Sequence, residues 1–322
     1  MNEHLSDRSI DEAVTERLTR RPWPTTPIRS DIEVSFEFFP TNTPAGAENL
    51  AACARALDEV GPSFFSVTYG AGGSTRERTH ATIELVKKTT SSDVAGHLTC
   101  VAATKDDVQA TLDTYRANGV RRIVALRGDT PQDTDPSTLP AGYEDAASLV
   151  EAIRSRPDGD DFDISVAAYP EVHPKALSAE ADLDNLKRKL DAGADRAITQ
   201  FFFDTDAFLR FQDRARRAGI TQPIVPGIMP VTNFGRIRGF AERCGTSIPS
   251  WMPDLFGGLD DEPAVQNLIA ATVAAEQCRR LAEHGVRQFH FYTMNKPELT
   301  AATCRILGVA TGSIADRSAN AS

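Results

Sequence analysis

Short apolar segments alternate with longer amphipathic segments along most of the chain. The short segments are rich in β-branched and aromatic residues and are bounded by Gly, Pro or Asp, which is typical of buried β-strands. They predict eight strands, at residues 33–39, 64–69, 96–101, 122–126, 163–169, 196–203, 223–229 and 287–292.

The longer segments carry the start and stop signals of helices. Thr104 and Ser178, for example, precede helical patterns that end at Gly119 and Gly193, as expected for N-caps and C-terminal glycines. Eight strands, each followed by a helix, predict an α/β fold of the (β/α)8 or TIM-barrel type. The stretch 248–284 is longer than one loop needs, and it predicts extra helices between strands seven and eight.

This pattern divides the chain into three predicted parts: a polar N-terminal extension (1–30), the barrel (31–308) and a polar tail (309–322). A doubly wound sheet is the competing architecture, and it would place a dinucleotide on a G-x-G-x-x-G turn after an early strand. The nearest match, "GAGGST" at 70–75, ends in Thr instead of Gly or Ala. We therefore favour the barrel.

Composition narrows the class of protein. The 322 residues carry a formal net charge of −10, which argues against a broad nucleic-acid interface because such an interface needs a basic surface. Neither a signal-peptide core nor a run of about 20 apolar residues is present, so we expect a cytoplasmic protein without membrane spans. The five cysteines are scattered and form no C-x-x-C pair, which predicts free thiols.

Polar residues stand near the predicted strand ends, where the active sites of TIM barrels lie. Singly, each has an ordinary structural explanation, and His97 and His290 in particular resemble core histidines. Together, so many polar strand ends are difficult to explain by packing. They are Glu37, Thr68, His97, Arg127, Asp129, Tyr169, His173, Gln200, Tyr292 and Lys296.

Glu37 raises a separate question because it interrupts the apolar strand "VSFEFFP". It is either a buried ion-pair partner or a functional acid, and burial is expected to raise its pKa. A second polar cluster lies in "DLDNLKRK", where Asp182, Asn185 and Lys189 share a helical face that Arg188 borders. That face is either simply solvated or able to hold a nucleotide diphosphate and its ribose.

The sequence argues against two other enzyme classes. A metal-dependent hydrolase could draw ligands from Glu37, His97, Asp129 and His173, but the H-x-H pair that such barrels often carry on strand one is absent. A Schiff-base aldolase often presents Lys on strand six, where this chain presents Gln200.

Eight collinear motifs across about residues 32–308 resemble methylenetetrahydrofolate reductase of the bacterial type. They are "VSFEFFP", "SVTYGAGGSTRERT", "HLTC", "VALRGD", "ISVAAYPEVHP", "DLDNLKRKLDAGADRAITQFFFD", "PGIMPVTNF" and "FHFYTMN". The resemblance implies a flavin-binding TIM barrel that holds FAD without a Rossmann motif and needs no metal. NADH or NADPH would reduce the FAD, which would then convert 5,10-methylenetetrahydrofolate to 5-methyltetrahydrofolate by ping-pong kinetics. We also expect a homo-oligomer without S-adenosylmethionine control.

The resemblance also assigns roles to residues. Glu37 matches a general acid that protonates N10 of the folate, and Asp129 matches a carboxylate near flavin and pterin. Substrate contacts are implied for Gln200, Arg236, Phe240, Tyr292 and Lys296, of which Arg236 and Lys296 depart from the enterobacterial pattern. FAD contacts are implied for Thr68, Tyr69, Ala71, His97, Arg127, Gly128, Asp129, Tyr169, His173, Ala176, Asp182, Asn185, Arg188 and Lys189. A flavin- or folate-binding protein without turnover is the remaining alternative.

Overall fold

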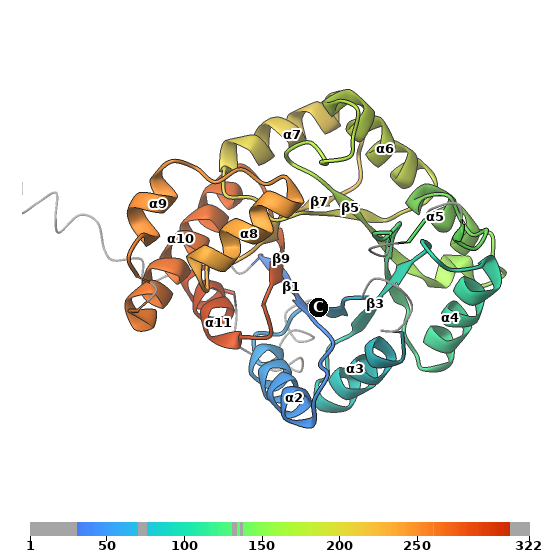
Figure 1. Ribbon diagram of the computed structural model, residues 1–322, viewed down its shortest axis with the longest axis horizontal. Helices are drawn as coiled ribbons and strands as arrows, with labels where there is room; N and C mark the ends of the chain where they lie inside the picture. The colour runs from blue at the N-terminus through green and yellow to red at the C-terminus, as the bar shows by residue number, and fades with distance from the viewer. Residues whose placement is uncertain (1–30, 70–75, 131–133, 136–137, 260, 310–322) are drawn as a thin grey trace, which may run out of the picture.

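Parallel strands form a ring that helices enclose in the computed structural model, which describes residues 31–69, 76–130, 134–135, 138–259 and 261–309 (Figure 1). The predicted (β/α)8 barrel is confirmed, and every strand pair in it is parallel. The strands are β1 (Glu33–Phe38), β2 (Phe64–Val67), β3 (Val94–Thr99), β4 (Arg122–Leu126), β5 (Asp163–Ala168), β6 (Arg196–Thr199), β7 (Ile224–Val225), β8 (Gly227–Ile228) and β9 (Gln288–Tyr292).

The barrel closes through a divided seventh strand. The sequence predicts one strand at 223–229, but Pro226 separates it into β7 and β8. β7 pairs with β6 and β8 pairs with β9, so the two halves of this strand join opposite edges of the sheet. Proline has no backbone N–H to donate, but its carbonyl still accepts a hydrogen bond from the His290 amide at 3.0 Å.

Helices follow the strands in the predicted order, and α9 and α10 supply the extra helices expected between strands seven and eight. Thr104 caps α4 in a capping box with Asp107, the Ser178 hydroxyl caps α6, and Gly245 ends α8 in the left-handed conformation. The helices are α2 (Pro44–Asp58), α3 (Arg76–Thr89), α4 (Lys105–Ala117), α5 (Ala146–Arg154), α6 (Ala179–Asp191), α7 (Thr205–Arg217), α8 (Phe234–Cys244), α9 (Trp251–Phe256), α10 (Pro263–Glu283) and α11 (Pro297–Ile306), with a 3-10 turn η2 (Gly159–Asp161).

Alternation along the strands builds two apolar regions. On β1, Val34, Phe36 and Phe38 belong to the large core shared with the helices, which leaves Ser35 and Glu37 on the opposite, inner face. A smaller cluster fills the inside of the ring with one residue from each of five strands: Phe64, Ala95, Val124, Ile198 and Val225. The apolar inner layer lies below Glu37, so Glu37 is positioned toward the carboxyl end of β1.

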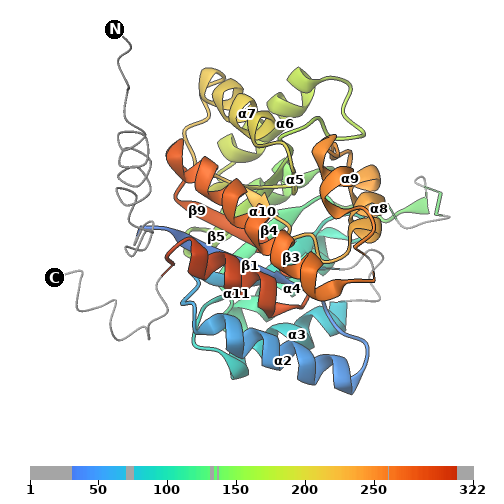
Figure 2. The ribbon, with the colours of Figure 1, turned by 90° about the vertical axis from the view of Figure 1, so that its left-hand side faces the viewer.

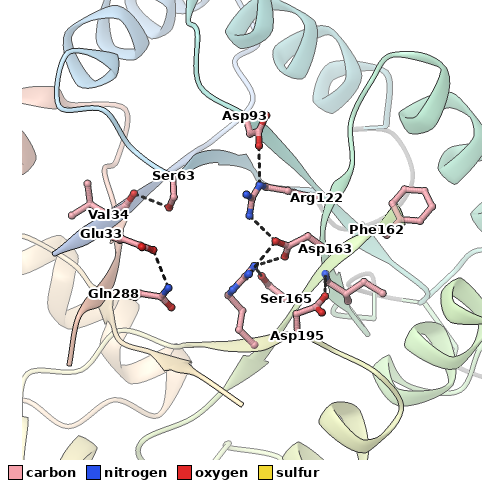
Figure 3. A network of polar contacts seen from close by, with 12 residues as sticks. Glu33, Val34, Ser63, Asp93, Arg122, Phe162, Asp163, Ser165, Asp195 and Gln288 are labelled. Atoms are coloured by element: carbon pink, nitrogen blue, oxygen red, sulfur yellow. Dashed lines mark hydrogen bonds and ion pairs between the residues drawn. The ribbon is translucent and has the colours of Figure 1, made fainter. Parts of the chain in front are cut away.

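Ion pairs cover the opposite end of the barrel, where the strands begin (Figure 3). Asp163 accepts from Arg122 at 2.7 Å and from Arg196 at 3.0 Å, and Arg122 also reaches Asp93 at 3.2 Å. These residues tie the starts of β4, β5 and β6 together. In TIM barrels this end serves stability and the other end carries the chemistry.

Candidate active site

Three buried side chains meet inside the barrel: Glu37 from β1, His97 from β3 and His290 from β9. Glu37 Oε2 lies 3.3 Å from His97 Nε2 and 3.5 Å from His290 Nε2. The other ring nitrogen of His290 shares a 2.7 Å hydrogen bond with the Ser35 hydroxyl. Strands β1 and β9 are neighbours only because the barrel closes, so the fold itself brings this cluster together.

The partners of Glu37 overturn one prediction. Burial by itself raises the pKa of this carboxyl, but contacts with His290 and His97 lower the pKa by more, from 4.5 to about 2. The expectation of a raised pKa is therefore wrong, because it considered only the apolar strand. The structure also places His97 deeper in its strand than the predicted boundary of 96 implies, since β3 begins at Val94 and His97 is its fourth residue.

Sequence reasoning missed the parts that Ser35 and His290 play. It treated His290 as an ordinary core histidine and did not connect it with Glu37. The available signal was alternation, because "FHFY" places His290 and Tyr292 on one face of β9. The Tyr292 hydroxyl donates to the Thr199 carbonyl at 2.7 Å, and burial raises the pKa of this phenol.

The loop after β9 holds the end of the strand that carries Glu37. The Thr293 hydroxyl donates to the Glu37 carbonyl at 2.7 Å. The Asn295 side chain accepts from the Phe39 amide and donates to the Phe39 carbonyl, both at 2.9 Å. Met294 and Asn295 adopt positive φ angles of 54°, which are unfavourable for side-chain-bearing residues. Lys296 follows, exposed, immediately before α11.

The turn after β4 presents Asp129 to solvent. Gly128 has φ of +83°, and a Cβ there would lie 2.7 Å from Val101 Cγ1, so the position requires glycine. The Asp129 side chain is 87% exposed and lies 3.6 Å from Lys175 Nζ. Arg127 is exposed beside it. The predicted carboxylate and cations therefore do stand at the carboxyl end of the barrel.

The loop after β5 is ordered by its own side chains. Tyr169 and His173 meet edge to face at 4.5 Å between ring centroids. Asp182 accepts from the His173 amide at 3.0 Å, and the Ala176 amide donates to the His173 carbonyl at 2.8 Å. Asp182 thus fixes this loop against the first turn of α6.

The polar residues of α6 separate into two groups. Arg188 pairs with Asp145 at 3.0 Å and donates to Asn185 at 3.0 Å, and both Arg188 and Asn185 are accessible from solvent. Lys189 instead is buried and donates to the Ala167 carbonyl on β5 at 2.5 Å. Burial lowers the pKa of Lys189 to about 8, although Asp182 and Asp145 favour its charged form.

The remaining predicted residues complete the rim. The Thr68 carbonyl accepts from Thr79, and the Tyr69 hydroxyl accepts from Arg76 at 2.5 Å. Ala71 lies outside the described residues. Gln200, directly after β6, accepts from the Phe201 amide at 3.0 Å.

Helix α8 brings two more predicted residues to this end of the barrel, which Figure 2 shows on the side away from the start of β1. Arg236 is exposed, and Phe240 is half-buried. The guanidinium of Arg243 lies over the Phe240 ring, 4.7 Å from the ring centroid. Arg243 is a residue that sequence reasoning did not select.

Unpartnered polar atoms test whether a ligand fits here. Among the described residues, Ser66 Oγ is buried and makes no hydrogen bond, and His97 Nε2 has no hydrogen-bond partner beside its 3.3 Å ion-pair contact with Glu37; buried polar atoms are costly to leave unsatisfied. The rim adds aromatic rings, cations and the Asp182 carboxylate, a donor set that fits a flavin nucleotide. Within the same described part of the chain, no group of three or more His, Cys, Asp or Glu residues is arranged to hold a metal ion.

The fold and these residues define a class: a TIM barrel whose carboxyl end carries a buried carboxylate–imidazole cluster beneath a polar, aromatic rim. The chain belongs to the methylenetetrahydrofolate reductase family, whose model matches residues 25–308. One relative is the 5,10-methylenetetrahydrofolate reductase of Escherichia coli strain K12, 47% identical over 285 residues, which are 88% of this chain and 94% of that one. The protein is therefore an oxidoreductase that acts on folates.

A more distant relative belongs to the same family, and a solved structure shares the fold. Methylenetetrahydrofolate reductase (NADH) 1 of Arabidopsis thaliana is 38% identical over 271 residues, which are 81% of this chain and 46% of the plant protein. A Clostridium thermocellum protein that binds two copies of 5-methyl-5,6,7,8-tetrahydrofolic acid has the same fold, with a TM-score of 0.58 at 12% identity, and the match covers 92% of this chain and 97% of that one. Among the described residues, no helix is long and apolar enough to cross a membrane.

Proposed function

We propose that this protein interconverts 5,10-methylenetetrahydrofolate and 5-methyltetrahydrofolate, with bound FAD and with NADH or NADPH as the second substrate, in a ping-pong reaction. The observation that carries the proposal is the buried cluster of Glu37, His97 and His290 in a chain of this family. FAD, when bound, accepts and returns a hydride. Side chains of this protein would bind and orient the FAD and the substrates and would supply the proton.

The rim residues would hold the FAD. Arg127 and Arg188 offer guanidinium groups to its phosphates, and Asp182 offers a carboxylate to its ribose hydroxyls. Tyr169 and His173 provide a preformed aromatic wall. Asp129, exposed at the same mouth, would stabilise the cationic iminium that the folate forms when its five-membered ring opens.

The cluster around Glu37 would supply the proton for that ring opening at N10. Because the two imidazoles favour the ionised carboxylate, the acid would be the cluster and not an isolated carboxyl. A proton held on an imidazole Nε2 lies within 3.3–3.5 Å of Glu37 Oε2, from which it can pass to the substrate. Gln200, Phe240, Tyr292 and Lys296 would position the folate, with Arg236 at the outer edge.

The absorption spectrum of the purified protein tests this proposal most directly. The protein should be yellow, and heating should release FAD and not FMN. Anaerobic NADH or NADPH should bleach the flavin, and methylenetetrahydrofolate should restore its colour. Continuous oxidation of the nicotinamide with menadione as acceptor separates an enzyme from a protein that only binds flavin. A colourless protein that also fails to bind added FAD would refute the proposal.

A further inference from the structure

One face of α8 combines two arginines with an aromatic ring. Arg236, Phe240 and Arg243 are spaced at i, i+4 and i+7, which places them within a narrow arc of the helix. Both arginines are exposed and Phe240 is half-buried. The ring packs against the apolar cluster that includes Met229, Val231 and Met252, so it forms a supported platform with a cation on each side along the helix.

The two arginines are not neutralised within the described part of the chain. Neither Arg236 nor Arg243 has a carboxylate partner there, whereas Arg188 on α6 pairs with Asp145. Arg243 instead places its guanidinium over the Phe240 ring at 4.7 Å. A cation–π contact at an exposed site is weak, so it can be exchanged for a stronger one.

The face containing Arg243 borders the candidate active site. The end of α8 packs beside the loop after β5, since the Ser247 amide donates to the Glu171 carboxylate at 2.9 Å and a Cβ on Gly245 would lie 2.8 Å from Pro174 Cγ. The protein as a whole carries a net charge of −10, so unpaired arginines at the mouth form a local positive region. Such a region raises the local concentration of anionic ligands against the field of the rest of the molecule.

We propose that Arg243 determines substrate affinity by binding the anionic group of whichever planar substrate stacks on Phe240. This inference rests on the proposed function, in which Phe240 contacts the folate, and it extends that contact to the nicotinamide substrate, which takes the folate's place in a ping-pong reaction. The ligand's ring would replace the guanidinium on Phe240, and Arg243 would move to the ligand's carboxylate or phosphate. Arginine suits both anions because it offers two parallel N–H donors to either. The glutamyl carboxylates of the folate and the phosphates of the nicotinamide nucleotide are the two sources of this chemistry.

The test compares Arg243→Gln and Arg243→Lys with the matched control Arg238→Gln, which changes an exposed arginine on the other side of α8. Dissociation constants are measured at low salt in the two anaerobic half-reactions, with NADH, NADPH, and mono- and triglutamyl methylenetetrahydrofolate. Arg243→Gln should weaken binding of at least one substrate by about three- to fivefold, the scale of an exposed charge pair. The limiting rate should stay nearly constant, Arg243→Lys should recover part of the loss, and high salt should reduce it.

Comparison of the four ligands shows which anionic group Arg243 binds. Weaker binding of NADH and NADPH assigns Arg243 to the phosphates, whereas weaker binding of the folates, larger with triglutamyl than with monoglutamyl folate, assigns it to the carboxylates. Unchanged dissociation constants for all four ligands would overturn the inference, as would an equal change in Arg238→Gln. Failure of the proposed function is a different result, because the parent protein itself would then lack FAD or show neither half-reaction.

Discussion

Replacing Glu37 by glutamine removes the charge of the proposed acid while keeping its size. Glu37 Oε2 now faces two imidazole nitrogens, at 3.3 and 3.5 Å. A glutamine amide can accept from one of them with its oxygen, but its NH2 group cannot pass a proton on to the substrate. The reaction of reduced flavin with methylenetetrahydrofolate should therefore slow by at least about 10²-fold, the usual scale for a lost general acid, which corresponds to about 2.7 kcal/mol.

Reduction of the flavin by NADH or NADPH needs no ring-opening proton, so it should change little. Anaerobic stopped-flow absorbance of the flavin measures both half-reactions separately. Glu33→Gln is a matched control, because it makes the same substitution on β1, at the opposite end of the barrel, where Glu33 accepts from Gln288 at 2.9 Å. That variant should retain both half-reactions. Equal losses in both half-reactions of Glu37→Gln would show that Glu37 is structural and would refute the reasoning.

Acid stability offers a second measurement on the same variant. The folded-state pKa of Glu37 is lowered to about 2, so its ionised form stabilises the native protein above its ordinary pKa of 4.5. This stabilisation should be lost as the pH falls from about 4.5 toward 2. Glu37→Gln should lack that part of the acid sensitivity, which unfolding of the two proteins across this pH range would reveal. Parallel unfolding curves would contradict the lowered pKa.

Three further predictions concern other parts of the site. Asp129→Asn should raise the flavin reduction potential, and slow transfer to folate more than reduction by NADH, because it removes a negative charge near the flavin; unchanged potential and folate kinetics would contradict the assignment. Arg236→Gln should raise the folate KM severalfold at low salt, with a smaller effect at high salt, since exposed charge pairs contribute up to about 1 kcal/mol; an unchanged KM would exclude this role. Lys189→Met tests the buried ammonium, whose pKa is lowered to about 8. Between pH 8 and 10.5 the unfolded chain binds more protons than the folded protein, so the parent should gain stability relative to the variant as the pH rises through that range. Thermal unfolding of both proteins measures this, and an unchanged difference in stability across the range would contradict the lowered pKa.

Local patterns were sufficient to predict the barrel because the spacing of apolar residues within each β/α unit already shows which of its faces is buried. The alternation in "VSFEFF" and the caps at Thr104 and Ser178 each depend on only a few neighbouring residues. The errors arose where distant parts of the chain decide the local structure. β3 starts two residues earlier than predicted, and Pro226 divides a strand that reads as continuous, because each half of that strand pairs with a different neighbour.

The candidate site likewise combines features that local sequence could predict with features that depend on distant parts of the chain. Individual polar strand ends could be selected from the sequence, since a TIM barrel gathers them at one mouth. The link between Ser35 and His290 could not, because their hydrogen bond joins residues 255 positions apart and exists only when the first and last strands meet. The same missing partner caused the wrong sign for the pKa of Glu37. Burial is visible in a strand's own composition, whereas the compensating imidazoles come from β3 and β9.

The identity of these partners bears on what a carboxylate is doing in an apolar strand. A purely structural buried Glu would be stabilised best by arginine, whose guanidinium stays protonated at every relevant pH and holds the carboxylate ionised. Glu37 is held instead by two histidines, and an imidazole nitrogen, unlike a guanidinium, can serve either as a donor or as an acceptor. In the proposed function, the same contacts that make burial of the charge tolerable would also let a proton pass at Glu37. The ion-pair partner and the functional acid, which the sequence left as alternatives, would then be two descriptions of one arrangement.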